Sequence, residues 1–261
     1  MLYFSNVTSV RGEARVRSLM SAALALLLLP ATGWAQAAGG FLADARTHCR
    51  VWWPARPPDA DADTAYAAQS AKWNGPCRNG LAEGRGTFEV ATTSRFMNDP
   101  PRSETWTGEG DFAGGRLGGR GFMVSTRGVR AEGEFAGGAL NGRGFITVTD
   151  STSFSRTEGE FRDGKLNGWG KIERGAIDRK GFFTRYEGEW RDGRQQGKGV
   201  FVSGKVGCNA QMRYEGEFQD GRMMGRGTLT TLEGRTQTAV FTLGQVDDVV
   251  PFKDDFDKVC R

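Results

Sequence analysis

The sequence predicts an all-β protein: a single-layer, elongated antiparallel sheet of about six to seven successive β-hairpins, with a short C-terminal capping helix. Three observations predict the sheet. Apolar residues or glycines alternate with charged residues over short stretches, a glycine-containing turn dipeptide follows each stretch, and the whole pattern recurs along the chain. Because 39 residues are glycine, we expect thin strands with few large side chains rather than a deep core.

The clearest hairpin spans residues 186–201. Tyr186, Gly188 and Trp190 alternate with two glutamates, so one face of the first strand is apolar and the other is acidic. Asp192-Gly193 follows, and this dipeptide is typical of a two-residue type I′ turn, in which both central residues adopt positive φ. The stretch therefore predicts a complete hairpin.

Counting outward from this turn assigns a partner to each residue of the first strand. Glu187 falls opposite Lys198 and Tyr186 opposite Gly199, so an acid meets a base and an aromatic ring lies over a glycine. The same count in other hairpins pairs Phe112 with Leu117, Phe135 with Leu140, Phe161 with Leu166, Phe218 with Met223, Glu109 with Arg120, Glu132 with Arg143, Glu158 with Trp169 and Glu215 with Arg226.

Six hairpins follow this register rule, and a seventh copy keeps only the fragment Phe241-Thr-Leu-Gly244. The six turns are Asn79-Gly80, Gly114-Gly115, Gly137-Gly138, Asp163-Gly164, Asp192-Gly193 and Asp220-Gly221. Extra length always follows the second strand and never interrupts a hairpin. This is typical of a repeat array whose insertions lie in loops along one edge.

The pattern Tyr-x-Gly-x-Trp/Phe-x-x-Gly-x-x-x-Gly-x-Gly-x-Phe resembles the MORN (membrane occupation and recognition nexus) repeat. Residues 186–201 and 214–229 match it almost position for position, and the resemblance extends from Trp73 to Gly244. Three units carry another residue in place of the first tyrosine: Gly108, Ala131 and Thr157. The resemblance implies a hairpin array, and it implies peripheral binding to anionic phospholipid as one function.

Residues 1–37 have the composition of a signal peptide. Three arginines precede an apolar run from Leu19 to Leu29, and small residues follow, so that cleavage after Ala35 or Ala37 fits. The apolar run is shorter than the ~20 residues that a membrane-spanning helix needs. We therefore expect an exported protein, periplasmic or secreted.

The charge of the mature chain is nearly balanced. The signal segment carries three arginines and one glutamate, so its removal lowers the formal net charge from +4 to +2. No basic patch with interleaved aromatic residues stands out, and we expect no nucleic-acid partner.

Two further segments flank the repeat domain, which we place at residues 73–244. Residues 38–72 form an N-terminal transition or cap, in which Val51-Trp52-Trp53 is expected to add a strand to the open edge of the first hairpin. Residues 245–261 form a C-terminal capping segment. There a short amphipathic helix is expected after Pro251, because Phe252, Phe256 and Val259 follow helical spacing.

Four cysteines in an exported chain indicate two disulfides. We predict Cys49–Cys77 and Cys208–Cys260, because each pair would fasten one end of the array. No Cys-x-x-Cys is present and His48 is the only histidine, so the spacing of metal ligands is absent and we expect neither a metal nor another cofactor.

Catalytic chemistry has little support in the sequence. His48 adjoins a predicted disulfide cysteine, which makes it a poor candidate for a catalytic imidazole. The rows of glutamate and aspartate would allow a hydrolase with paired carboxylates, but the register pairs most of them with bases. We expect a salt-paired, solvated sheet face and no catalytic residue.

The apolar face is the candidate binding surface, here called the aromatic trough. It consists of Trp106, Phe112, Phe135, Phe161, Tyr186, Trp190, Tyr214 and Phe218. The sequence thus predicts a non-enzymatic repeat scaffold of the cell envelope that holds a protein or peptide partner in this trough or along an edge strand. Peripheral binding to anionic phospholipid is the alternative, which the near-neutral charge weakens, and a hydrolase with an unrecognised carboxylate site is the third.

Overall fold

The computed structural model describes residues 39–54, 64–96, 100–176, 181–208, 211–242 and 245–246. Strands and turns account for nearly all of them, and none of these described residues lies in a helix that is long and apolar enough to cross a membrane. The strands are β1 (Gly40–Ala43), β2 (Arg50–Trp53), β3 (Thr64–Asn74), β4 (Cys77–Arg78), β5 (Leu81–Ala82), β6 (Gly84–Phe96), β7 (Arg102–Ala113), β8 (Arg116–Ser125), β9 (Val129–Ala136), β10 (Ala139–Thr149), β11 (Ser153–Arg162), β12 (Lys165–Ala176), β13 (Phe182–Arg191), β14 (Arg194–Lys205), β15 (Gln211–Gln219), β16 (Arg222–Thr230), β17 (Thr236–Thr242) and β18 (Gln245–Val246).

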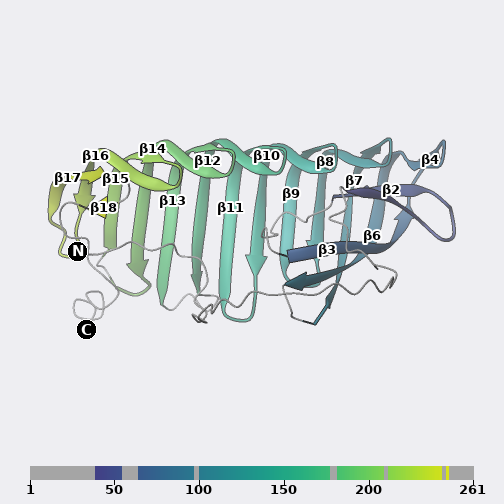
Figure 1. The fold of residues 1–261 in the computed structure, drawn as a ribbon, viewed down its shortest axis with the longest axis horizontal. Helices are drawn as coiled ribbons and strands as arrows, with labels where there is room; N and C mark the ends of the chain where they lie inside the picture. The colour runs from purple at the N-terminus through teal and green to yellow at the C-terminus, as the bar shows by residue number, and fades with distance from the viewer. Residues whose placement is uncertain are drawn as a thin grey trace, which may run out of the picture.

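Fourteen of these strands form one elongated antiparallel sheet (Figure 1). Its order is β18-β17-β16-β15-β14-β13-β12-β11-β10-β9-β8-β7-β6-β3, so each strand pairs with its neighbour in the chain. The one interruption is β4–β5, a short hairpin at the end of the β3–β6 pair that belongs to a second sheet. The predicted array of successive hairpins is confirmed.

The predicted turns are also confirmed. Asp192 and Gly193 have φ of 49° and 80°, and Gly114 and Gly115 have 57° and 77°. Positive φ at both central residues is the signature of the type I′ turn, whose twist matches that of the flanking strands. The other four predicted turns share this geometry.

The predicted register holds only next to the turns. Trp190 pairs with Gln195 as expected, but Glu187 lies opposite Val200 and Tyr186 opposite Phe201, two residues beyond the predicted partners. A bulge in β14, with Gly197 at φ 61°, inserts the extra residues. The hairpin count was wrong beyond this point because it assumed an unbroken ladder.

The same displacement changes the charge pairs predicted within each hairpin. The four predicted pairs of Phe with Leu or Met beside the turns are observed. The predicted pairs farther from the turns are not cross-strand pairs: Glu109–Arg120, Glu132–Arg143, Glu158–Trp169, Glu187–Lys198 and Glu215–Arg226. The bases instead face acids of the following hairpin: Arg120 opposite Glu134, Arg143 opposite Glu160, and Lys198 opposite Glu217.

A line of paired glycines crosses the long sheet. It contains Gly86, Gly110, Gly121, Gly133, Gly144, Gly159, Gly170, Gly188, Gly199 and Gly216. Large side chains lie over this line: a Cβ added to Gly199 would be 2.6 Å from Cζ of Tyr186. The ring therefore covers the predicted glycine, although the backbone of Tyr186 pairs two residues farther on.

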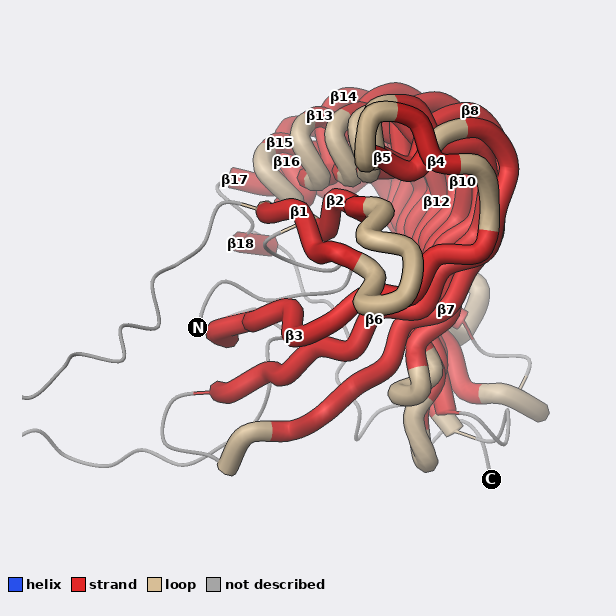
Figure 2. The backbone as a smooth tube through the Cα atoms, turned by 90° about the vertical axis from the view of Figure 1, so that its right-hand side faces the viewer, coloured by secondary structure: helices blue, strands red, loops and turns tan. Residues whose placement is uncertain are grey.

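The sheet curls along its length, so that the hairpin turns fold back over one face (Figure 2). Backbone hydrogen bonds join each of the last five predicted hairpin turns to the preceding hairpin. The donors are the N–H groups of Gly115, Gly138, Gly164, Gly193 and Gly221. They donate, in this order, to the carbonyls of Ala82, Leu117, Leu140, Leu166 and Gln195, at 2.8–3.0 Å. These bonds fix the turns as a row along the rim of the concave face.

The N-terminal segment forms its own small sheet, in the order β1-β2-β5-β4. β2 is a strand, as predicted, but it pairs with β1 and with β5 instead of extending the first hairpin. The long sheet ends at β3, which includes Trp73 and begins at Thr64, within the segment that the sequence assigns to the N-terminal transition.

The predicted Cys49–Cys77 disulfide is confirmed, with the two Cα atoms 5.9 Å apart. It fastens the start of β2 to β4 and thereby holds the small sheet on the first hairpin. Several other predictions fall outside the described residues: the signal peptide at 1–37, the helix at 251–259, Gly244, and Cys260 of the Cys208–Cys260 pair.

Peptide mapping tests the second disulfide. Trypsin digestion without reduction should release residues 206–213 joined to 259–261, because these peptides contain Cys208 and Cys260. Mass spectrometry before and after reduction identifies the pair. A link from the peptide 47–50, which contains Cys49, to either of these peptides would contradict the pairing.

Candidate functional site

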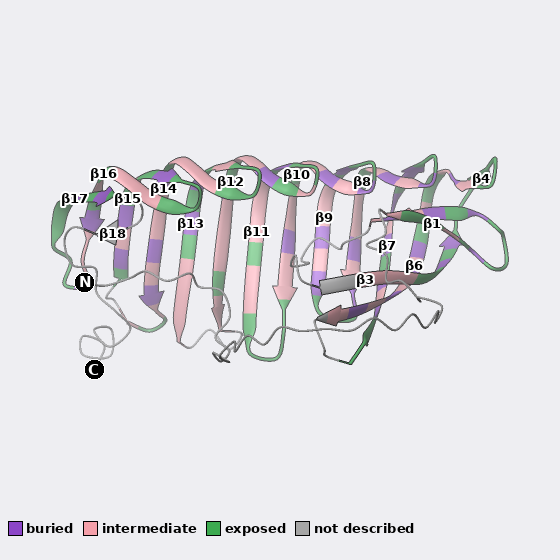
Figure 3. Ribbon diagram, viewed as in Figure 1, coloured by how far each residue is buried: buried purple, intermediate pink, exposed green. Residues whose placement is uncertain are grey.

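The aromatic trough predicted from the sequence lies on the concave face, and its rings are packed against one another. Seven of its eight residues are buried, with at most 5% of their surface exposed, and Trp190 is half-buried. Buried positions recur from strand to strand along the long sheet (Figure 3). The Tyr186 ring lies 5.2 Å from that of Trp190 and 4.7 Å from that of Phe218. The rings thus form the core of the fold, and a binding role for them stays a prediction.

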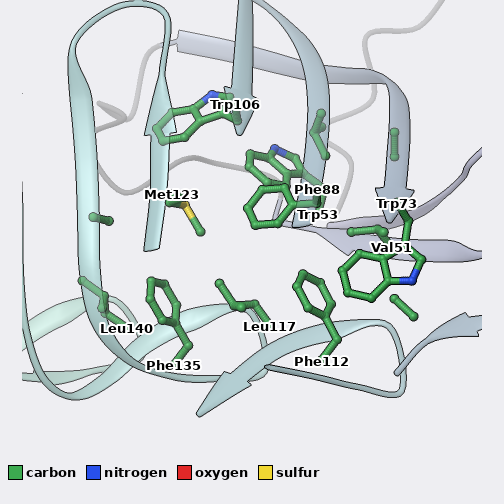
Figure 4. Packing of buried hydrophobic residues seen from close by; sticks show 14 of the residues in the cluster. Val51, Trp53, Trp73, Phe88, Trp106, Phe112, Leu117, Met123, Phe135 and Leu140 are labelled. Carbon is green, nitrogen blue, oxygen red and sulfur yellow. The ribbon is translucent and has the colours of Figure 1, made fainter. Parts of the chain in front are cut away.

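Two rows of side chains meet in this core (Figure 4). Phe88 and Trp106 lie on the long parts of the strands, and Phe112, Leu117, Phe135 and Leu140 lie near the turns, on the part of the sheet that folds back. Curling the sheet brings the rows face to face, which removes both from water without a second layer.

The N-terminal strand β2 enters between the two rows. The Trp53 ring lies 5.9 Å from Phe88 and 5.8 Å from Trp106, and Val51 is fully buried beside them (Figure 4). This contact was not predicted, because it depends on packing between distant segments. The concave face therefore holds an extended strand of the chain itself at its N-terminal end.

The glycine line is covered by leucines in three units of the array and by tyrosines in the last two. In the last two MORN-like units, Tyr186 and Tyr214 cover it. In the three units that lack the tyrosine, leucines near the turns take over; Leu140 Cδ2, for example, would lie 3.0 Å from a Cβ on Gly144. The substitutions Gly108, Ala131 and Thr157 are thus compensated from the opposite row.

Both tyrosine hydroxyls are used inside the fold. Tyr186 donates to the carbonyl of Glu189 at 3.1 Å, and Tyr214 donates at 3.4 Å to that of Glu217. Burial raises the pKa of Tyr186, with a smaller contribution from the nearby Glu189 charge, and burial also raises the pKa of Tyr214. The two phenols therefore stay protonated and act as structural donors.

Trp190 is the predicted trough residue with the most accessible side chain. Its indole N–H donates to the carbonyl of Gly170 at 3.0 Å, which fixes the orientation of the ring. One edge stays in contact with solvent, since the residue is only half-buried. Among the trough residues, Trp190 therefore has the side chain that a partner could contact most readily.

The opposite face is polar and largely salt-paired. Arg130, Arg156 and Arg213 each pair with the glutamate two residues ahead in the same strand, at 2.6–2.8 Å. A hollow of about 570 Å³ lies on this face, lined by Arg85, Glu109, Arg120, Gly121, Phe122, Glu132, Gly133, Glu134 and Arg143. Acids and bases line it in equal numbers.

These exposed ion pairs should contribute little to stability. We expect Arg213→Gln, which removes the pair with Glu215, to change the free energy of unfolding by less than about 0.5 kcal/mol, because both partners are solvated. Urea unfolding at low and high salt measures the change. A loss of several kcal/mol would show that the polar face stabilises the sheet.

The described residues hold no group of three or more His, Cys, Asp or Glu side chains placed to bind a metal ion. His48 lies in the connection between β1 and β2, where its backbone N–H donates to the carbonyl of Asp44. The geometry thus offers a long curled sheet with a packed concave face, a row of turns on its rim, and a polar outer face.

Comparison with protein families matches the MORN repeat to residues 132–152, 158–174, 186–205 and 214–231. The four matches cover the hairpins from β9–β10 to β15–β16. A comparison with curated proteins gives no match.

Proposed function

The chain belongs to the MORN-repeat proteins, with four repeats within residues 132–231, and from this premise we propose that it is a non-enzymatic scaffold of the cell envelope that binds a protein or peptide partner. MORN repeats occur in protein and lipid interactions and are generally non-enzymatic. A long, rigid repeat surface suits the binding of an extended partner.

The proposal rests on the packing of β2 in the concave face. Val51 and Trp53 fill the space between the two rows of the trough, and the backbone of β2 runs along the turns. An extended segment is therefore a chemically suitable occupant of this face. Past Trp53, the half-buried Trp190 supplies an aromatic surface on the same side of the sheet.

Export to the envelope is the second part of the proposal, and it rests on the composition of residues 1–37. N-terminal sequencing of the protein recovered from a periplasmic or secreted fraction tests it. We expect the mature chain to begin at Gln36 or Ala38. Recovery of the uncleaved chain in the cytosolic fraction would contradict export.

Photo-crosslinking tests partner binding. Trp190, the half-buried residue of the trough, is replaced with p-benzoylphenylalanine, and the matched control replaces Trp169, which is 54% exposed on the polar face. Cells that export each variant are irradiated, and adducts are identified by mass spectrometry. We expect a defined protein adduct from position 190 and none from position 169; adducts from position 169 alone would move the interface to the polar face.

Anionic phospholipid is a second candidate for the binding partner, and the arginines of the polar hollow favour it. Arg120 and Arg143 flank this hollow, but Glu132 and Glu134 line it too, so attraction to an anionic surface is weak. Co-sedimentation with phosphatidylglycerol vesicles, compared with phosphatidylcholine vesicles, distinguishes the candidates. Strong, salt-sensitive binding to the anionic vesicles alone would favour the lipid function over the partner function.

A further inference from the structure

The backbone of β2 runs along the row of turns through regularly spaced hydrogen bonds. The N–H of Arg50 donates to the carbonyl of Gly80 at 2.9 Å, and the N–H of Trp52 donates to that of Gly115 at 2.7 Å. Alternate residues of one strand thus reach the glycine at the second position of two successive turns. Pro54, which has no N–H, occupies the next alternate position and ends this series.

Aromatic side chains of the same hairpin lie on the turn glycines. The Trp52 ring covers Gly138, where an added Cβ would be 2.5 Å from ring atom Cζ3, and the Phe41 ring covers Gly115. The Arg116 guanidinium lies 4.2 Å from the centre of the Trp52 ring. An aromatic ring of β2 therefore contacts both a turn glycine and the base that follows a turn. The contact with the base is a cation–π interaction.

The last three turns offer the same groups without such an occupant. Gly164, Gly193 and Gly221 are held by the same turn-to-hairpin hydrogen bonds, and their carbonyls accept no hydrogen bond from any residue that the structure describes. An added Cβ at any of them would have no neighbour nearer than 3.8 Å. Each is followed by a base, namely Lys165, Arg194 and Arg222.

We propose that these three turns bind an extended segment of a partner protein that carries an aromatic residue, in the way that β2 occupies the first turns. The partner's alternate N–H groups donate to the carbonyls of Gly164, Gly193 and Gly221. Its aromatic rings lie on the bare glycines beside the bases. The proposal rests on the proposed partner-binding function and assigns the recognition to the rim rather than to the packed interior of the trough.

The chemistry of this row selects for backbone donors and rings. Hydrogen bonds from an added strand supply affinity that depends little on sequence, and side-chain contacts supply specificity. Because all the acceptors are backbone carbonyls, a partner must present its own N–H groups in an extended conformation. The adjacent Lys165, Arg194 and Arg222 favour an aromatic ring over an aliphatic side chain.

Nuclear magnetic resonance of the full mature chain tests this directly. The probe is a synthetic peptide with the β2 sequence Arg-Val-Trp-Trp flanked by glycines, added to isotope-labelled protein. We expect saturable shifts in the carbonyl and amide signals at Gly164, Gly193 and Gly221. Methylating the backbone nitrogen of the first tryptophan, which corresponds to Trp52, should weaken binding by about fivefold.

Two controls separate the inference from its alternatives. The peptide methylated at the valine nitrogen keeps the donors that face the turns, so its affinity should stay within about twofold of the parent. A triple variant with Lys165, Arg194 and Arg222 each changed to Gln should weaken binding while leaving the melting temperature unchanged. Shifts at the Trp190 indole with none at the turns would overturn this inference but support binding in the trough; no shifts, or equal affinity of all peptides, would overturn it outright.

Discussion

Gly188→Ala should lower the melting temperature by about 5–10 °C, although it adds a single methyl group. The added Cβ would lie 2.5 Å from the carbonyl oxygen of Lys198 and 2.6 Å from Cα of Gly199, both backbone atoms of the paired strand β14. Neither can move without breaking the ladder that joins β13 to β14. Overpacking of this kind costs about 1–3 kcal/mol or more, which corresponds to a few degrees per kcal/mol in a domain of this size.

Gly40→Ala is the matched control for this prediction. Gly40 also lies in a strand, but no atom lies within 4 Å of the position that its Cβ would take. We expect the melting temperature of this variant to change by less than about 2 °C. Calorimetry on both variants measures the effect; a shift for Gly188→Ala as small as that for Gly40→Ala would show that the glycine line tolerates side chains.

The strand register could be predicted from the sequence beside the turns but not beyond the bulges, where it depends on which glycines belong to the glycine line. The turn dipeptides predicted the six turns along the rim, because positive φ at two successive residues leaves few other conformations. The bulges were not predictable by counting, since Gly197 and Gly199 look alike in the sequence. One is the bulge residue at φ 61°, and the other belongs to the glycine line under Tyr186. Only the pairing of whole strands distinguishes them.

The candidate site was predictable in composition but not in arrangement. Alternation placed Tyr186 and Trp190 on one face, and the structure agrees. Whether such a face is open or filled depends on the curl and on segments distant in the chain. Trp53 packs on Trp106, and Trp52 lies on Gly138, contacts for which no local pattern exists. The packing of β2 along the row of turns was not predicted for the same reason.

Replacing Asp44 should loosen the packing of the N-terminal hairpin on the array, although the Cys49–Cys77 disulfide still tethers it. This carboxylate is 1% exposed, and it accepts backbone N–H groups from Trp73 at 2.8 Å, Arg46 at 2.7 Å and Thr47 at 3.0 Å. Two of these bonds shape the β1–β2 connection, and the third ties it to β3. We expect Asp44→Ala to destabilise the protein by about 3 kcal/mol or more, because buried donors lose a charged partner. Urea unfolding followed by tryptophan fluorescence measures the loss.

The pH dependence of Asp44→Asn identifies the charge as the cause. The N–H of Trp73, followed by that of Thr47, holds the pKa of Asp44 well below its usual range against the opposing effect of burial. Because the folded-state pKa is depressed, the stabilisation is fully present above the unfolded value of about 3.9 and is lost as the pH falls below it. The stability difference between the wild type and Asp44→Asn should therefore be largest at pH 5–7 and shrink towards about pH 2.

Asp163→Asn, at an exposed turn position that tolerates asparagine, should show almost no difference at any pH. A difference for Asp44→Asn that stays constant from neutral to acid pH would show that the shape of the side chain, and not its charge, holds the N-terminal hairpin in place.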